Sequence, residues 1–269
     1  MTRRRFPVGK TLLYVFMSLW ALTTIYPFIW VILNSFKPRG LIRSDTFSLP
    51  IGDKFTLENY VTAFKRVDIG TAYVNSIVIS GAVTVVVMVL AGLAAYAMVR
   101  YSFRLRGFLH SMIIASMMFP VFSTIIPVFR MESSWGIVNT GSIWLTRLSV
   151  VLPQIAGNLS FAIIVLMGFI RSLPVDLEEA AYLEGYNVYQ IFFRIIMPLA
   201  KPSFATVGIF TFLWSYNDLF LQMFFLRSKK FFTITRLLNE ISSQAGTNYG
   251  LMVAAVVMVV IPVLVGYIF

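Results

Sequence analysis

Long apolar runs separated by short polar segments dominate the pattern along this chain. A helix needs about 20 residues to cross a hydrocarbon core. Six runs reach that length: residues 11–36, 72–99, 107–129, 148–170, 202–226 and 242–269. The third contains only His110, the fifth only Asp218, and the other four contain no charged residue. Because helices satisfy their own backbone hydrogen bonds in lipid, the pattern predicts an all-α, polytopic membrane protein with about six transmembrane helices in one domain, 1–269.

Composition supports a membrane rather than water as the solvent. Of the 269 residues, 58% are hydrophobic and 12% are charged, which is too little charge to cover a soluble domain. The net charge of +11 comes from basic residues scattered in short segments between the runs, so we expect no nucleic-acid partner. The chain has no cysteine, which excludes disulfides and cysteine metal sites. The first run is too long for a signal-peptide core and is expected to remain as the first helix.

Basic residues near the runs give the expected orientation. Their total is divided almost evenly between the two sides and does not decide it. The arginines at 3–5 precede the first run, and those at 100, 104 and 106 lie between the second and third runs. Positive charges in such short segments favour the cytoplasmic side, so both termini are expected in the cytoplasm. Residues 37–70 then lie outside, where Thr56 is expected to cap a short helix with Glu58 in its first turn.

The segment 171–201 has the pattern of two short helices joined at a glycine. Ser172 is expected to cap the first helix, and Pro174 to occupy its first turn. Three acidic residues favour the positive end of that helix: Asp176, Glu178 and Glu179. Gly185 is expected to end the helix in a left-handed conformation.

The second helix of this segment has an apolar face. Asn187 is expected to cap it, and Pro198 and Pro202 to close it. Its apolar residues fall at positions i, i+3, i+4 and i+7: Val188, Ile191, Phe192 and Ile195. A loop of this hydrophobicity is expected to dock on another part of the protein or on a partner.

A motif runs through the same segment. It consists of Glu179-Ala180-Ala181, then Gly185, then Ile195, one residue, and Met197-Pro198. Its spacing resembles the cytoplasmic loop of binding-protein-dependent ABC importer permeases, in which a leucine stands where this chain has Met197. That exchange conserves volume. The chain departs from the family at Tyr186-Asn187, where small residues are usual, and it stops at Phe269 without the short cytoplasmic tail that these permeases usually carry.

The resemblance extends along most of the chain. Within this family, the chain is most similar to the maltose and multiple-sugar group. The residues that carry it outside the loop are Thr56 to Tyr60, Asn75-Ser76, Ala94-Ala95-Tyr96, Asn139-Thr140-Gly141, Trp214 and Asn217-Asp218. It implies a type I ABC importer permease fold and the import of a sugar or oligosaccharide. The implied location is the cytoplasmic (inner) membrane of a bacterium.

The resemblance also implies a heteromeric complex. The expected partners are a second, homologous permease subunit, two ATPase subunits and an extracytoplasmic substrate-binding protein. ATP and magnesium would be bound by the ATPases, so this chain would hold no cofactor or metal and would be a non-catalytic subunit. Residues of the loop would form the ATPase-coupling element: Glu178, Glu179, Ala180, Ala181, Tyr182, Gly185, Tyr186, Ile195 and Pro198.

Asp218 is the one carboxylate within an apolar run, and a charge at that depth costs about 2.5–3.5 kcal/mol on insertion scales. One interpretation places it in a sugar path with Trp214, Tyr216 and Asn217. The alternative is a buried polar contact with a neighbouring helix. Asn158 begins a glycosylation sequon, but it lies within a run and is discounted for that role.

Other membrane functions have less support in the sequence. An ion-coupled secondary transporter normally has several ionisable groups within its spans, and a channel would leave the amphipathic loop at 171–201 unexplained. An intramembrane enzyme would need a metal motif or paired intramembrane aspartates. Sensitivity of uptake to vanadate would separate an ATP-driven importer from all three.

Overall fold

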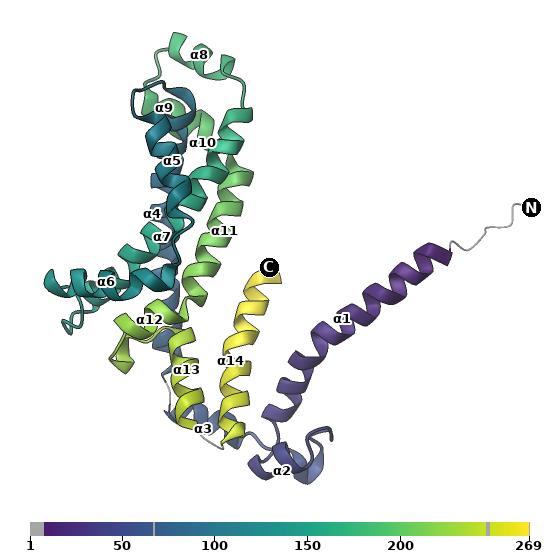
Figure 1. Ribbon diagram of the computed structural model, residues 1–269. Coiled ribbons are helices and arrows are strands. Elements are labelled where there is room, and N and C mark those ends of the chain that lie inside the picture. The colour runs from purple at the N-terminus through teal and green to yellow at the C-terminus, as the bar shows by residue number, and fades with distance from the viewer. Residues whose placement is uncertain (1–7, 67, 246–247, 269) are drawn as a thin grey trace, which may run out of the picture. The chain divides into compact units, whose positions relative to one another are not determined.

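The computed structural model describes residues 8–66, 68–245 and 248–268, and every regular element in these ranges is a helix (Figure 1). The chain divides into two compact units. Unit 1 comprises residues 1–68 with 238–269, and unit 2 comprises residues 69–237. The helix α13 (Ile234–Ala245) contains the boundary between them.

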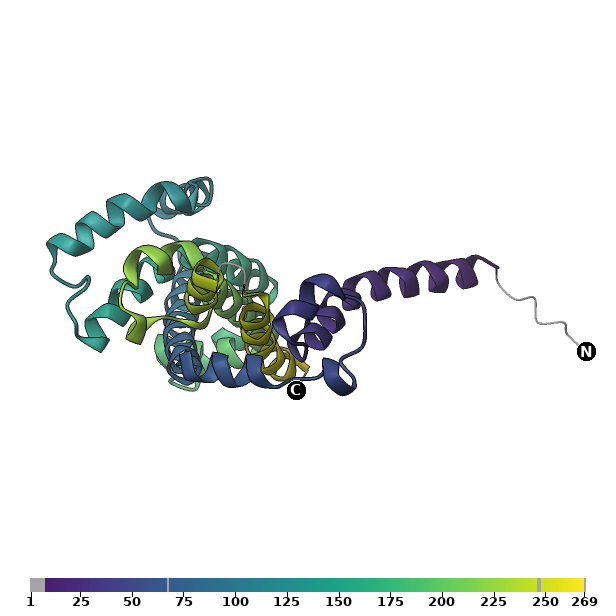
Figure 2. The same ribbon diagram turned by 90° about the horizontal axis from the view of Figure 1, so that it is seen from below.

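Three long helices form the bundle of unit 2. They are α4 (Ile69–Arg100), α7 (Ile143–Ser172) and α11 (Lys201–Asn217), and each packs against the other two. Figure 2 views this bundle from below. A stripe of α4 residues four apart is fully buried, and it consists of Val83, Val87, Ala91 and Ala95. Small side chains at the last two positions let neighbouring helices approach closely.

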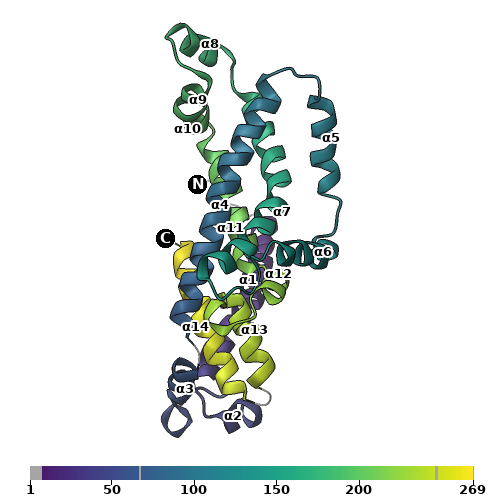
Figure 3. The same ribbon diagram turned by 90° about the vertical axis from the view of Figure 1, so that its left-hand side faces the viewer.

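The third apolar run is not one straight helix. It forms α5 (Arg106–Ser116) and α6 (Val121–Ser134), which meet at an angle of 103° (Figure 3). The cause is Pro120, which adopts an extended conformation and caps α6. A proline also disfavours the helical conformation in the residue before it, here Phe119. Hydropathy records only how apolar a run is, so it did not predict the break at Pro120.

The fifth run is also interrupted. The helix α11 ends at Asn217, and Asp218 caps the short helix α12 (Leu219–Phe225). The 3₁₀-helix η3 (Lys229–Phe231) follows. A second bend of 82° separates α11 from the helical segment that precedes it, Val188–Leu199.

Unit 1 contains α1 (Val8–Ser35) and α14 (Tyr249–Ile268), which pack against each other. Three short elements of unit 1 follow α1 in the sequence: α2 (Arg39–Ser44), the 3₁₀-helix η1 (Gly52–Lys54) and α3 (Glu58–Arg66). The predicted short helix is therefore present, and Thr56 Oγ1 accepts the Glu58 backbone N–H at 3.1 Å. The sixth apolar run begins later than expected, because residues 242–245 belong to α13.

Three described helices are long and apolar enough to cross a membrane: Gly9–Ser35, Ile69–Arg100 and Ile143–Ser172. The number rises to five if each bent pair counts as one span. The apolar helix α14 is described in addition. The all-α membrane architecture predicted from hydropathy is therefore confirmed, although two runs contain breaks.

Candidate coupling loop and candidate substrate cavity

The segment between α7 and α11 lies at one end of unit 2 (Figures 1 and 3). It consists of α8 (Asp176–Leu183), α9 (Val188–Ile191), the π-helix η2 (Phe192–Ile196) and α10 (Met197–Leu199). We call residues 173–200 the coupling loop, after the role that the resemblance leads us to expect for them. The predicted arrangement of helix, glycine and helix is confirmed. Ser172 is not the cap of α8, because it is the last residue of α7 and donates to the Phe169 carbonyl at 2.7 Å.

Gly185 ends α8 as predicted. Its φ is +85°, in the left-handed region that glycine tolerates best. The Gly185 N–H donates to the Tyr182 carbonyl, and the Tyr186 N–H donates to the Ala181 carbonyl, each at 3.0 Å. These two bonds form a Schellman motif, which satisfies carbonyls left free at the end of the helix. The bend is therefore built into the backbone.

Asn187 caps α9 through a capping box. Its Oδ1 accepts the Gln190 N–H at 2.9 Å, and Gln190 Oε1 accepts the Asn187 N–H at 2.8 Å. The buried face of the segment 188–199 differs from the prediction at two positions, because Val188 is exposed and Ile196 rather than Ile195 is fully buried. The π-helix takes more residues per turn than an α-helix, which shifts the register. Nothing in the amino-acid pattern identifies that extra residue.

The two faces of α8 have different surroundings. Glu179, Ala180 and Tyr182 are exposed, and Leu183 is 91% exposed. Glu178 and Ala181, which were expected in the same partner surface, are only 4% and 5% exposed and are buried within unit 2. Of the other predicted coupling residues, Gly185 and Pro198 are exposed, whereas Tyr186 and Ile195 are half-buried.

Glu178 is held at the end of α4. Its Oε1 accepts a hydrogen bond from Arg100 Nε at 2.5 Å, and its Oε2 accepts one from the Tyr96 hydroxyl at 2.8 Å. Arg100 Nη2 also donates to the Leu173 carbonyl at 2.9 Å. Both carboxylate oxygens and two guanidinium nitrogens are thus paired away from water.

A second contact joins α8 to the chain after α4. The hydroxyls of Tyr182 and Tyr101 are 2.9 Å apart, and the Tyr101 ring meets Tyr96 edge-on. The hydrogen bond with Tyr101 raises the pKa of Tyr182 above its ordinary value. Tyr182 therefore stays neutral and keeps this contact through the physiological pH range.

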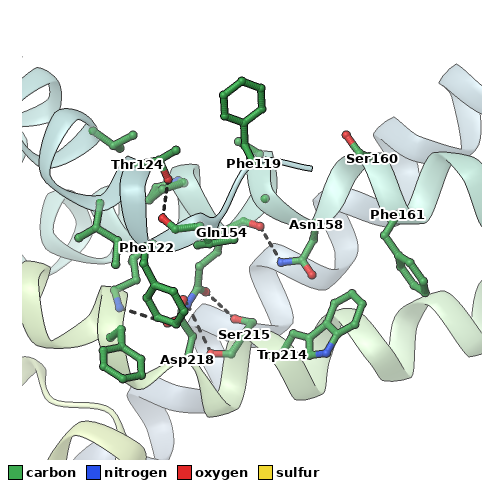
Figure 4. Close-up of a pocket in the computed structure, with 18 of the residues that line it drawn as sticks. Phe119, Phe122, Thr124, Gln154, Asn158, Ser160, Phe161, Trp214, Ser215 and Asp218 are labelled. Carbon is green, nitrogen blue, oxygen red and sulfur yellow. Dashed lines mark hydrogen bonds between the residues drawn. The ribbon is translucent and has the colours of Figure 1, made fainter. Parts of the chain in front are cut away.

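Unit 2 also contains a cavity of about 760 Å³ (Figure 4). Residues from α5, α6, α7, α11 and α12 line it. Three of the residues predicted for a substrate path are among them: Trp214, Asn217 and Asp218. Tyr216 is not, since its side chain is buried elsewhere and stacks on Phe212. Tyr216 is two positions after Trp214, and residues two apart on a helix do not lie on the same face.

Asp218 fits both interpretations of the sequence. It lines the cavity, yet both of its carboxylate oxygens have protein partners. Oδ1 accepts the Leu221 N–H at 3.1 Å and caps α12, and Oδ2 accepts Gln154 Nε2 at 3.0 Å (Figure 4). The carboxylate therefore fixes the break between α11 and α12 and joins it to α7.

Amide side chains of α7 also belong to this site, although they were not among the residues predicted for it. Gln154 Oε1 accepts the Ser215 hydroxyl at 2.6 Å, and Asn158 Nδ2 donates to the Gln154 carbonyl at 2.7 Å. Ser215 Oγ also lies 3.2 Å from Ser80 Oγ on α4. The available signal was the spacing of Gln154 and Asn158, four residues apart in an uncharged run, which places both on one face of a helix.

Aromatic side chains form other parts of the cavity wall. Trp214 meets Phe161 edge-on with ring centroids 4.8 Å apart, and Phe122 meets Phe220 at 4.9 Å. Trp214 remains 48% exposed. Amides beside aromatic faces can hold a ligand that presents hydroxyls and C–H surfaces. In the described ranges, no group of three His, Cys, Asp or Glu side chains is placed to hold a metal ion.

Comparison with known proteins gives a consistent result. Residues 88–269 match the family described as binding-protein-dependent transport system inner membrane component. The diacetylchitobiose uptake system permease protein of Streptomyces coelicolor is 34% identical over 94% of this chain and 82% of its own length. The trehalose transport system permease protein of Mycobacterium tuberculosis is 31% identical over 90% of this chain and 85% of its own length.

The fold has a close counterpart among solved structures. One chain of a bacterial ABC transporter involved in the import of the acidic polysaccharide alginate superposes with a TM-score of 0.82. The match covers 99% of this chain and 96% of that one, at 23% sequence identity. This likeness establishes the fold.

Proposed function

The chain belongs to the family of binding-protein-dependent transport system inner membrane components, and from this premise we propose that it is one of two permease subunits of an ATP-driven sugar importer. It is a multi-pass membrane protein of an ABC transport system. The proposed substrate is a sugar or oligosaccharide. In support, two relatives above 30% identity carry the names of a diacetylchitobiose and a trehalose permease.

The coupling loop is the proposed docking element for a separate ATPase. The observation that carries the proposal is its two-sided construction. Glu178 and Ala181 are buried and anchor α8 to the rest of unit 2, while Tyr182 and Leu183 are exposed beside a bend fixed by Gly185. Exposed apolar and aromatic side chains on a rigid support suit a protein partner. We propose that the loop and both chain termini lie on the cytoplasmic side, as the basic residues near the apolar runs suggest.

The cavity is the proposed contribution of this subunit to the sugar path. Asn158 supplies an amide group and Trp214 an aromatic face. Gln154 holds Asp218 and Ser215 in place at the cavity wall. The second permease would complete the path, two ATPases would bind ATP and magnesium, and an extracytoplasmic binding protein would deliver the sugar. The chain itself would be a non-catalytic subunit, as its membership of a transport permease family suggests.

The test is uptake by the purified complex in liposomes. The tagged chain is isolated with its co-purifying subunits, reconstituted with the sugar-binding protein, and supplied with labelled sugars. We expect uptake that requires ATP and is blocked by vanadate. Uptake that persists in vanadate and collapses with an ionophore would contradict the proposal and indicate an ion-coupled transporter.

A further inference from the structure

The coupling loop is joined covalently to α7 and α11, but its buried polar contacts go to α4. Glu178 is bonded to Tyr96 and Arg100, and Arg100 is also bonded to the Leu173 carbonyl. Tyr182 is bonded to Tyr101, one residue beyond the end of α4. Contacts from both ends of α8 therefore converge on the C-terminal end of α4 and on the residue that follows it.

The ion pair at the centre of these contacts is almost completely hidden from water. The side chains of Arg100 and Glu178 are 10% and 5% exposed. Removing one partner of such a pair leaves the other charge buried without compensation, so the contact resists partial opening. Displacement of α8 therefore moves the end of α4 with it, or breaks the pair altogether.

The helix that receives this contact is suited to carry a displacement. It has 32 residues and no proline, whereas α7 contains Pro153. It packs along both α7 and α11. Ser80 lies twenty positions before Arg100, which at 1.5 Å per residue is about 30 Å along the axis. At that position Ser80 contacts Ser215, within the polar network of the cavity.

We propose that Tyr96, Arg100 and Glu178 form a clamp that makes α4 the strut between the coupling loop and the cavity. Glu178 is then a positioning residue that faces the bundle, rather than a direct contact to the ATPase. This inference rests on the proposed coupling role of the loop. It adds which transmembrane helix receives the displacement and through which atoms.

The experiment measures the ratio of ATP hydrolysed to sugar transported in liposomes that contain the whole complex. Glu178→Gln and Arg100→Gln each remove the ion pair, and Tyr96→Phe removes one hydroxyl. The matched control is Arg104→Gln, an exposed arginine shortly after α4 and outside the coupling loop. We expect ATP hydrolysis within twofold of wild type and an ATP-to-sugar ratio at least fivefold higher in the first two variants, with a smaller rise in Tyr96→Phe.

The double variant separates a clamp from independent effects. Because both residues act through one contact, the double variant Glu178→Gln with Arg100→Gln should have an ATP-to-sugar ratio no higher than that of either single variant. A wild-type ratio in all variants would overturn the proposal. So would an equal fall of uptake and hydrolysis, which would make Glu178 an ATPase contact. If the ion-pair variants do not assemble into the complex, the ATP-to-sugar ratio of Tyr96→Phe tests the proposal: a raised ratio supports the clamp, and a wild-type ratio overturns it. Failure of the wild-type complex to use ATP would instead contradict the proposed function.

Discussion

Buried polar side chains are the most informative single residues of this chain. In unit 1, Asn59 donates from Nδ2 to the carbonyls of Ser35 at 2.9 Å and Lys37 at 2.8 Å. Lys37 is fully buried and donates from Nζ to the carbonyls of Asp45 at 3.0 Å and Thr46 at 2.8 Å. Each side chain satisfies backbone groups that the loop after α1 would otherwise leave unpaired.

Gly250→Ala tests the space around Asn59. A Cβ at residue 250 would lie 2.2 Å from Asn59 Oδ1, so the amide must move and its two hydrogen bonds must lengthen or break. We expect a loss of about 1–3 kcal/mol in stability, the cost of leaving buried polar groups unsatisfied. The measurement is the thermal denaturation of the purified protein. The control is Gly168→Ala, where a Cβ meets nothing within 4 Å. Equal midpoints for both variants would contradict the prediction.

Lys37→Met tests the buried ammonium group. Without Nζ, two carbonyls lose their donor, and we expect a loss of about 1–3 kcal/mol. Lys54→Met should cost less than about 1 kcal/mol, because Lys54 pairs with Asp45 at the surface, where both side chains are about 40% exposed. Thermal denaturation of the two variants measures the difference.

The pH dependence of the same variant has a defined sign. Burial lowers the pKa of Lys37 below its ordinary value of 10.5. The unfolded chain therefore holds this proton more tightly, and stability rises as pH increases from the lowered pKa toward 10.5. The stability advantage of wild type over Lys37→Met should grow between neutral and alkaline pH. An advantage that shrinks over that range would show that the charged form is the one favoured by folding.

At the scale of elements, the ends and breaks of helices decide the geometry. Pro120 turns α6 away from α5, Asp218 separates α12 from α11, and Gly185 separates α8 from α9. The π-helix η2 changes which residues of the loop are buried. These local features set the orientation of the two candidate sites, whereas hydrophobicity sets only which segments are helical.

Gly185 allows a graded test of the bend. Space around it is open, so only the left-handed backbone limits the side chain. Asparagine tolerates that conformation better than other residues, and a β-branched residue tolerates it poorly. We expect Gly185→Asn to keep most ATP-driven uptake and Gly185→Val to lose it by tenfold or more, with both variants inserted at wild-type levels. Equal uptake by the two variants would remove the backbone explanation.

At the scale of the molecule, both candidate sites lie within unit 2. The loop occupies one end of the α4, α7 and α11 bundle, and the cavity is lined by α7, α11 and α12 together with α5 and α6. A single packed unit can therefore link the two through its own helices. That arrangement is what a subunit that couples ATP hydrolysis to transport requires.

Trp214→Ala tests the two sites separately. Loss of an aromatic face in the cavity is worth about 0.5–1.5 kcal/mol, which corresponds to a two- to tenfold fall in the maximal uptake rate. ATP hydrolysis stimulated by the loaded binding protein should change little, because the coupling loop is untouched. Trp135→Ala, at an exposed tryptophan outside the cavity, is the control. A fall in hydrolysis equal to the fall in uptake would place Trp214 in coupling instead.

Prediction from the sequence was accurate where one residue type has a strong local effect. Apolar runs predicted the helices, Asn187 the cap of α9, and Gly185 the left-handed end of α8. It was less accurate at the cavity, where Tyr216 was included and Gln154 was missed. Which side of a helix faces a cavity depends on neighbouring helices, and those contacts do not appear in a single sequence.

The sequence by itself determined the class of protein, the motif of the loop between α7 and α11, and the positions of most helices. These features follow from the transfer of apolar side chains from water to lipid and from the backbone conformations that individual residues prefer. Both effects act over a few neighbouring residues. Only the tertiary structure decided that Glu178 faces Tyr96 and Arg100, that Asp218 meets Gln154, and that Ile196 replaces Ile195 in the buried face. Such pairings join residues up to 82 positions apart, and they form because a buried charge or amide must find its partner wherever the packed helices bring one.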